Sequence, residues 1–141
     1  MKKTWPLIAL ILAVAALGLS VYNTVTAYRP APQPAEEIQY VMYLGTNDKD
    51  TNEPKFTADE AKQRLDQVLT RHFEGFTIQE ANGGWTNEDG TVSHEYTLVI
   101  YLSGTTSDRV HACAAELLTE FNQSSVLIQS NKTMTEFYNG K

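Results

Sequence analysis

The feature that most constrains this chain is an uncharged stretch of twenty-five residues near its N-terminus, from Thr4 to Tyr28. A helix rises about 1.5 Å per residue, so roughly 20 apolar residues are enough to cross the hydrocarbon core of a bilayer. The densest part reads WPLIALILAVAALGL, and two basic residues, Lys2 and Lys3, precede it. Because basic residues that flank a span stay on the cytoplasmic side, we expect residues 1–28 to form a single-pass anchor in the cytoplasmic membrane. The rest of the chain would then lie outside the cytoplasm.

A cleaved signal peptide is the alternative interpretation of the same stretch. Small residues at Val25, Thr26 and Ala27 follow a basic start and an apolar middle, as a signal peptidase requires. The apolar run is long for the middle section of a signal peptide, which favours the retained anchor. Cleavage would leave the domain secreted rather than tethered, and both interpretations place it outside the cytoplasm.

A proline-rich linker follows this segment. Its sequence, RPAPQPAEE, has proline at alternate positions, and such a pattern favours an extended polyproline II spacer. We therefore divide the chain into residues 1–28 as anchor or signal peptide, residues 29–37 as linker, and residues 38–141 as a single globular domain.

The globular part is distinctly acidic. The chain carries seventeen Asp and Glu against eleven Lys and Arg, a formal charge of −6. Positions 1–29 hold three basic residues and no acid, so positions 30–141 hold eight basic and seventeen acidic residues, a net charge of −9. Nucleic-acid binding needs clustered Lys and Arg, so we expect no nucleic-acid partner. A single cysteine excludes an internal disulfide and a cysteine-rich zinc site, and we expect no cofactor.

Apolar periodicity beyond the linker predicts four strands and two helices. The pattern places strands at 38–44, 76–85 and 91–102, and a last strand that starts at 125 and resumes between 133 and 138. The order βαββαβ indicates an α+β fold, a ferredoxin-like sandwich with both helices on one face of a four-stranded antiparallel sheet. In the full chain this sandwich would follow an N-terminal transmembrane helix.

Local signals mark where these elements start and stop. Thr57, with Glu60 three residues on, is typical of a capping box that opens the first helix, and Gly75 supplies a left-handed stop. The second helix is expected to open near Thr105. The pair Gly83-Gly84 indicates a bulge or tight bend in the second strand.

The face of the sheet without helices is expected to carry an apolar cluster. In this fold the first and third strands are central, and side chains alternate between the two faces. The cluster consists of Val41, Tyr43, Val99 and Tyr101. Exposed apolar clusters mark partner surfaces, so we expect a protein partner or a second copy of the chain, as a homodimer, to contact it.

Three short motifs resemble a known family. They are YVMYLG at 40–45, GGW at 83–85 and NQSSVL at 122–127. In identity and order they are similar to the uncharacterised bacterial domain-of-unknown-function family numbered thirty-five seventy-four, small exported domains, over roughly residues 38–138. The resemblance implies a bacterial protein, export and a compact α+β domain, and it assigns no activity or catalytic residue.

One loop has oxygen ligands at alternate positions, as calcium-binding loops do. They are Asp48, Asp50 and Asn52. The glycine that a calcium loop needs next for its sharp turn is replaced by Glu53. A solvated acidic loop is therefore favoured over a calcium site, and we expect no metal.

His94 and Tyr96 on the third strand are weak candidates for acid–base catalysis. They share a face of the strand, while Glu95 points to the opposite face. Trp85, after the two glycines, is a candidate for stacking on a ligand. A structural role is favoured for His94, and Cys113 fits the apolar stripe of the second helix.

Two hypotheses of function follow. The favoured one is a membrane-tethered, extracytoplasmic binding or interaction domain that associates with a partner, or with itself, through the open sheet face. The alternative is a small exported enzyme of unknown reaction, with a pocket near His94, Tyr96 and Trp85. The sequence favours a protein that is not an enzyme.

Overall fold

The computed structural model describes residues 5–27 and 34–140, which fall into two units. The unit at the N-terminus contains helix α1, Trp5–Ala27, which is 23 residues long. Lys2, Lys3, Tyr28 and positions 29–33 of the predicted linker lie outside the described residues. Counted over the residues that are described, no helix is long and apolar enough to cross a membrane.

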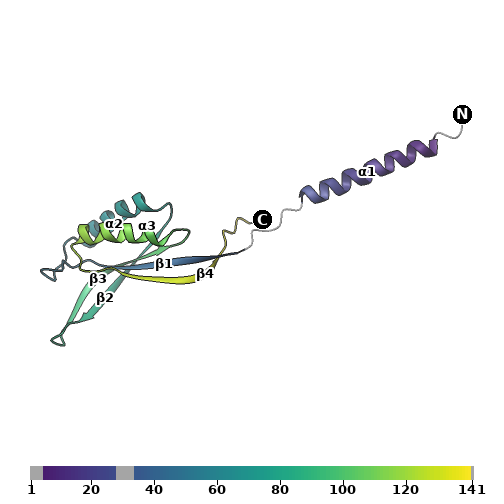
Figure 1. Ribbon diagram of the computed structural model, residues 1–141. Helices are drawn as coiled ribbons and strands as arrows, with labels where there is room; N and C mark the ends of the chain where they lie inside the picture. The colour runs from purple at the N-terminus through teal and green to yellow at the C-terminus, as the bar shows by residue number, and fades with distance from the viewer. Residues whose placement is uncertain (1–4, 28–33, 141) are drawn as a thin grey trace. The chain divides into compact units, whose positions relative to one another are not determined.

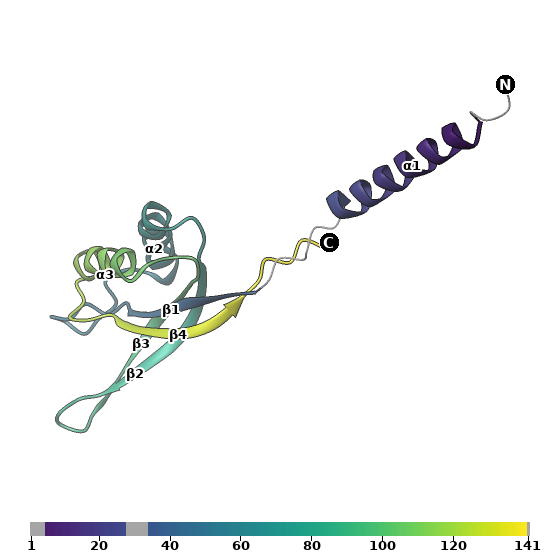
Figure 2. The ribbon, with the colours of Figure 1, turned by 45° about the vertical axis from the view of Figure 1, so that its right-hand side comes forward.

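The second unit, Ala35–Thr135, is an α+β sandwich (Figure 1). Its sheet has the strand order β2-β3-β1-β4, with every neighbouring pair antiparallel. Helices α2 and α3 lie together on one face of the sheet (Figure 2). The predicted βαββαβ order, with the first and third strands in the centre, is confirmed. The elements are β1 Ala35–Gly45, α2 Ala58–His72, β2 Thr77–Thr86, β3 Val92–Leu102, α3 Ser107–Phe121 and β4 Leu127–Thr135.

Capping defines the start of both helices in this unit. Thr57 caps α2, and its partner Glu60 completes the predicted capping box. The cap of α3 is Thr106, one residue after the predicted Thr105. The predicted stop at Gly75 is wrong, because α2 already ends at His72, where Phe73 turns into an extended conformation.

Strand β1 is longer than predicted, and β2 and β4 are more regular. β1 begins at Ala35, three residues before the predicted start, because it pairs with β4 along its whole N-terminal part. β4 is one unbroken strand where an interruption was expected. No bulge occurs at Gly83, because β2 and β3 pair residue for residue from Thr77 to Thr86.

The hydrophobic core lies between the helices and the sheet. Alternate residues of the two central strands face the helices and are fully buried, among them Met42, Leu44, Leu98 and Ile100. Cys113 of α3 belongs to this core, and burial raises the pKa of its thiol to about 12. The cysteine is therefore a core residue, as the sequence indicated. From the helices, the core takes mainly Leu65, Val68 and Leu69 of α2 and Val110, Leu117 and Phe121 of α3.

Candidate functional site

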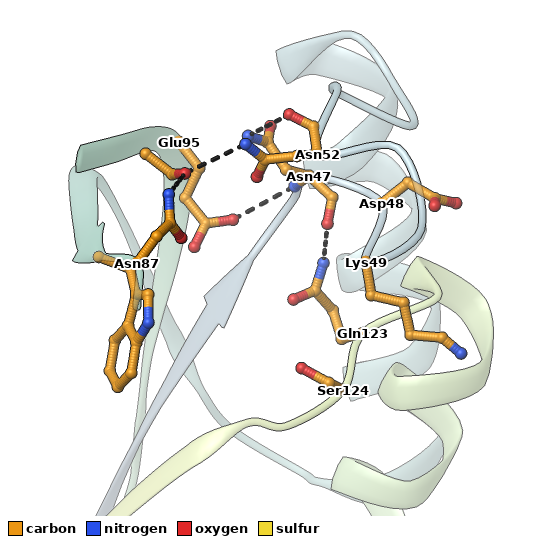
Figure 3. A pocket seen from close by; sticks show the side chains of 10 residues that line it. Asn47, Asp48, Lys49, Asn52, Asn87, Glu95, Gln123 and Ser124 are labelled. Carbon is orange, nitrogen blue, oxygen red and sulfur yellow. Dashed lines mark hydrogen bonds between the residues drawn. The ribbon is translucent and has the colours of Figure 1, made fainter. Parts of the chain in front are cut away.

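A polar pocket of about 200 Å³ opens at the end of the sheet where β1 ends. Three segments that are far apart in the sequence line it (Figure 3). They are the loop after β1, the β2–β3 hairpin and the residues after α3. The lining side chains belong to Asn47, Asp48, Lys49 and Asn52 of the loop, to Trp85, Asn87, Ser93 and Glu95 of the hairpin, and to Gln123 and Ser124.

The loop is held in place by the residue that ends α3. Asn122 takes a left-handed conformation, with φ of 50°. Its side-chain amide donates to Asp48 Oδ2 at 2.9 Å and to Asp50 Oδ2 at 2.8 Å, and its carbonyl accepts from the Lys49 amide at 3.0 Å. The hydrogen bond from Asn122 is also the main reason that the pKa of Asp48 lies below its usual range.

This arrangement differs from a calcium loop. The two carboxylates that we considered as ligands converge on the Asn122 amide, so this side chain occupies the place that a cation would take. The third candidate ligand, Asn52, does not contact Asn122 through its side chain; its side-chain amide donates a hydrogen bond to the Ser93 hydroxyl. Within residues 5–27 and 34–140, no group of three His, Cys, Asp or Glu side chains could hold a metal ion.

Asn47 forms the inner corner of the pocket. It is 9% exposed, and its backbone N–H donates to Glu95 Oε2 at 3.3 Å. Its side-chain amide donates to the carbonyls of Asn52 and His94, at 3.2 and 3.3 Å. The side-chain amide of Gln123 in turn donates to the Asn47 carbonyl. The three segments that line the pocket are therefore joined at this one residue.

The outer wall is built around Ser93. Its hydroxyl accepts hydrogen bonds from the side-chain amides of Asn52, at 3.1 Å, and Asn87, at 2.9 Å (Figure 3). Trp85 pairs with Ser93 across the hairpin, and its side chain is 74% exposed. The network fixes the shape of the pocket, and the exposed Trp85 side chain belongs to its lining.

Glu95 is the half-buried acidic group of this pocket, and two glycines make room for it. A Cβ at Gly45 would lie 2.3 Å from Glu95 Oε2, and a Cβ at Gly83 would lie 3.5 Å from its Cγ. No Lys, Arg or His of the described residues forms an ion pair with it. Within the described residues, the carboxylate accepts a hydrogen bond from the Asn47 backbone N–H and from no other group. Sequence analysis did not identify Glu95, although a glycine on each neighbouring strand was a signal.

The structure does not bring Trp85 together with His94 and Tyr96. The side chain of His94 is exposed on the helix-facing side of β3, and only its backbone carbonyl reaches Asn47. Tyr96 lies beside Glu80, which pairs with Lys62 of α2 at 2.8 Å. Burial, followed by the neighbouring Glu80 carboxylate, raises the pKa of Tyr96. Tyr96 thus lies close to α2 and the His94 side chain does not line the pocket, whereas Trp85 joins Asp48 and Asn52 there.

The open sheet face is more covered than expected. Val41 and Val99 lie on it, as predicted, but each is only 5% exposed. The two tyrosines extend to the edge strands: Tyr43 donates to Gln129 Oε1 at 3.2 Å, and Tyr101 donates to Gln79 Oε1 at 2.9 Å. By register, each valine is flanked by both tyrosines and one glutamine. At this cluster the sheet therefore presents tyrosine and glutamine side chains, and the two valines between them are buried.

Comparison with known proteins identifies a family and a fold. The family described as "Protein of unknown function (DUF3574)" matches residues 39–137. No curated protein matches the sequence. Among solved structures, a phage SAM lyase in complex with S-methyl-5'-thioadenosine is similar at 16% identity and a TM-score of 0.54, over 79% of this chain and 98% of that chain. CutA from Synechococcus elongatus is similar at 12% identity and a TM-score of 0.47, over 73% of this chain and 81% of that one. At these identities the likeness shows the fold alone.

Proposed function

Because this chain belongs to the DUF3574 family of proteins of unknown function, we propose its function from its own site: a membrane-tethered, extracytoplasmic domain that binds a small ligand in the pocket at the end of the sheet. The observation that carries this proposal is Glu95. Its carboxylate forms no ion pair with residues 5–27 or 34–140, and it sits in a pocket whose shape is fixed by hydrogen bonds. Preformed pockets with a few convergent polar groups are typical of ligand sites.

The family resemblance gives independent support for this location. The motif at 40–45 ends with Gly45, the motif at 83–85 contains Gly83 and Trp85, and the motif at 122–127 begins with Asn122. All three segments meet at the pocket, although they come from different parts of the chain. The three motifs on which the resemblance rests thus each contribute residues at or next to the site.

Binding fits the lining better than catalysis does. The lining consists of amides, hydroxyls, the exposed indole and charged groups, and it contains no histidine or cysteine. An acid–base reaction at His94 and Tyr96 would need these two residues to face a common cavity with Trp85, which they do not. The enzyme alternative therefore has less support than a binding domain.

The tether is proposed from the sequence of the N-terminal segment. Its uncharged run, the preceding lysines and the proline-rich spacer together suit a retained anchor with the domain on the far side of the membrane. α1 extends through this run as a helix. Cleavage of the segment would instead release the same binding domain.

The proposal is tested by screening the full chain with a panel of small ligands that covers organic cations, anions and neutral polyols. Amide resonances are followed by NMR, and the expected result is a saturable shift at Asn47, Glu95 and Trp85 for at least one class. Binding should be lost in Trp85→Ala and kept in Phe137→Ala, an equally exposed aromatic residue outside the pocket. The proposal fails if no class of compound moves these resonances.

Self-association through the open sheet face is a second candidate. The observation that favours it is charge: among the residues that the register assigns to this face, only Glu37 and Glu95 are charged, and both lie towards its ends. The two-stranded halves also repeat each other, with Tyr43 and Gln129 matching Tyr101 and Gln79. Such repetition suits a two-fold contact between identical copies.

Sedimentation and crosslinking of the full chain in detergent test this second candidate. We expect a dimer that is weakened in Tyr43→Ala and Tyr101→Ala and unchanged in Tyr138→Ala, which alters an exposed tyrosine outside this unit. A strict monomer at high protein concentration would contradict it.

A further inference from the structure

The chemistry of the ligand follows from which hydrogen-bonding groups of the pocket are already in use, and the inference rests on the proposed function. Each side-chain amide of the lining donates at least one N–H group to a partner inside the protein. Asn47 donates to two backbone carbonyls, Asn52 and Asn87 donate to the Ser93 hydroxyl, and Gln123 donates to the Asn47 carbonyl. Asn47 and Asn87 thereby use both side-chain N–H groups, Asn87 with Thr91 as its second acceptor, whereas Asn52 and Gln123 each keep one. The amides therefore offer a ligand few donors.

The same bonding leaves acceptors. The side-chain oxygens of Asn47, Asn52, Asn87 and Gln123 accept no hydrogen bond within the described residues, and Glu95 Oε1 likewise accepts none. Figure 3 shows the side-chain oxygens of Asn87 and Gln123 turned towards the Glu95 carboxylate. Each amide is fixed in this orientation because its nitrogen is held on the other side. The pocket therefore offers a set of oxygens around one negative charge.

The charged and aromatic groups around the pocket indicate which class of ligand it can bind. Lys49 is exposed, and its side chain runs away from Glu95 in Figure 3, so it does not neutralise the carboxylate. Asp48 adds a second carboxylate, which is engaged by Asn122. The exposed indole of Trp85 provides an aromatic face, on which cations bind favourably. We infer that the pocket binds an organic cation with several N–H donors, an alkylammonium or guanidinium group.

The size of the pocket limits the ligand to about one such group. A volume of about 200 Å³ is smaller than the pockets that enclose a drug-sized molecule. The cation can belong to a free small amine, or it can be the end of a lysine or arginine side chain in a peptide. Both sources share the same chemistry, and the experiment separates them.

The test titrates the full chain with methylguanidinium, butylammonium, tetramethylammonium and acetate, and with two capped tripeptides, Gly-Arg-Gly and Gly-Lys-Gly. Calorimetry gives the affinity, and the Trp85 indole resonance reports the location. Guanidinium or ammonium is expected to bind at the pocket, whereas tetramethylammonium, which has no N–H donor, and acetate are not. Stronger binding of the tripeptides would identify a side chain as the source, and equal or weaker binding would identify a free amine.

The variant Glu95→Gln keeps the size of the side chain and removes its charge. We expect it to weaken cation binding about tenfold or more, because hydrogen bonds to a charged group are stronger than those between neutral groups. Glu88→Gln, which removes the same charge from an exposed position in the hairpin turn outside the pocket, should bind as the unmodified chain does.

Three results would overturn the inference. One is binding of an anion or a polyol at the pocket in preference to the cations, which would leave the proposed binding function intact. The second is equal binding of tetramethylammonium, which would remove the requirement for donors. The third is unchanged affinity in Glu95→Gln. If no ligand of any class binds, the proposed function fails together with the inference.

Discussion

At the scale of single residues, the site depends on two glycines, whose lack of a side chain leaves space for their neighbours. Gly45 pairs with Thr97 and Gly83 pairs with Glu95, so the two glycines lie diagonally on either side of β3, and the Glu95 side chain occupies the space beside both. The two glycines differ in what an added Cβ would meet. At Gly45 it would meet the flexible end of Glu95, and at Gly83 it would meet Thr97 Oγ1 at 2.4 Å. Thr97 is β-branched and buried, so it has little freedom to move.

We therefore expect Gly83→Ala to lower the free energy of unfolding by about 1–3 kcal/mol, as overpacking of a buried site does. Gly45→Ala should cost less stability but displace Glu95 from the Asn47 amide, which will be visible as a shift of the Asn47 amide resonance. Urea unfolding of the full chain provides the measurement. Gly75→Ala is the control, because an added Cβ there meets open space. Equal stability of all three variants would show that the spaces at Gly45 and Gly83 are not required.

Residue-level reasoning from the sequence found part of this site. Trp85, Asp48 and Asn52 were each identified, because an isolated tryptophan and alternating oxygen ligands are visible in the sequence. Their meeting in one pocket was not predicted, since it depends on how the β2–β3 hairpin and the loop after β1 lie in space. The role of Asn122 was not predicted for the same reason. In the sequence it follows a helix, and only the structure places its side-chain amide between Asp48 and Asp50.

At the scale of elements, α2 begins with a complete capping box. Thr57 accepts from the Glu60 backbone N–H at 3.3 Å, and the Glu60 carboxylate accepts from the Thr57 backbone N–H at 3.0 Å. These bonds satisfy amides that have no partner within the helix. The same helix carries a second threonine, Thr70, whose hydroxyl donates to the Asp66 carbonyl one turn earlier.

Thr57→Ala is expected to lower the free energy of unfolding by about 1 kcal/mol, the usual cost of losing an N-cap side chain. Thr70→Ala, the same substitution inside the helix, is expected to leave stability unchanged or raise it slightly, because alanine has the higher helix propensity. Thermal unfolding of both variants measures the contrast. A loss of the same size in both would contradict a specific role for the cap.

The capping box also predicts a dependence on pH. Hydrogen bonds from the backbone and side chain of Thr57 hold the pKa of Glu60 below its usual range. A carboxyl whose pKa is lowered on folding stabilises the protein above its unfolded pKa of about 4.3, and this stabilisation is lost as the pH falls through the folded value. The stability difference between Thr57→Ala and the unmodified chain should therefore narrow below about pH 4, as unfolding at several pH values would show.

The elements themselves were largely predictable, and the exceptions have physical causes. Alternation predicted which residues of β3 face the core, and the capping pattern predicted the start of α2. The ends of strands depend on partners that are remote in sequence: Ala35 is in β1 because Thr135 lies opposite it. We predicted a bulge at Gly83 because glycine has a wide range of backbone conformations. In the structure, Gly83 instead leaves space for the Thr97 side chain.

At the scale of the whole molecule, the proposed tether predicts where the protein is found in a bacterial cell. The full chain should sediment with membranes and resist extraction by high salt, because apolar contacts with lipid do not depend on ionic strength. A chain that lacks residues 1–27 should remain in the soluble fraction. Protease added outside the cytoplasmic membrane should degrade the globular domain of the full chain. Recovery of the full chain as a salt-soluble cytoplasmic protein would contradict the tether.

The separation between the two ends of β1 has a consequence for how the protein can be immobilised. The chain enters the sheet at Ala35 and leaves it at Thr135, which pairs with Ala35, while the pocket lies beyond Gly45. An eleven-residue strand separates these ends by about 30 Å. An affinity tag or a sensor chip attached next to Ala35 or Thr135, at the opposite end of β1 from the pocket, therefore leaves the pocket unobstructed, so that the immobilised domain can serve directly as bait for its ligand.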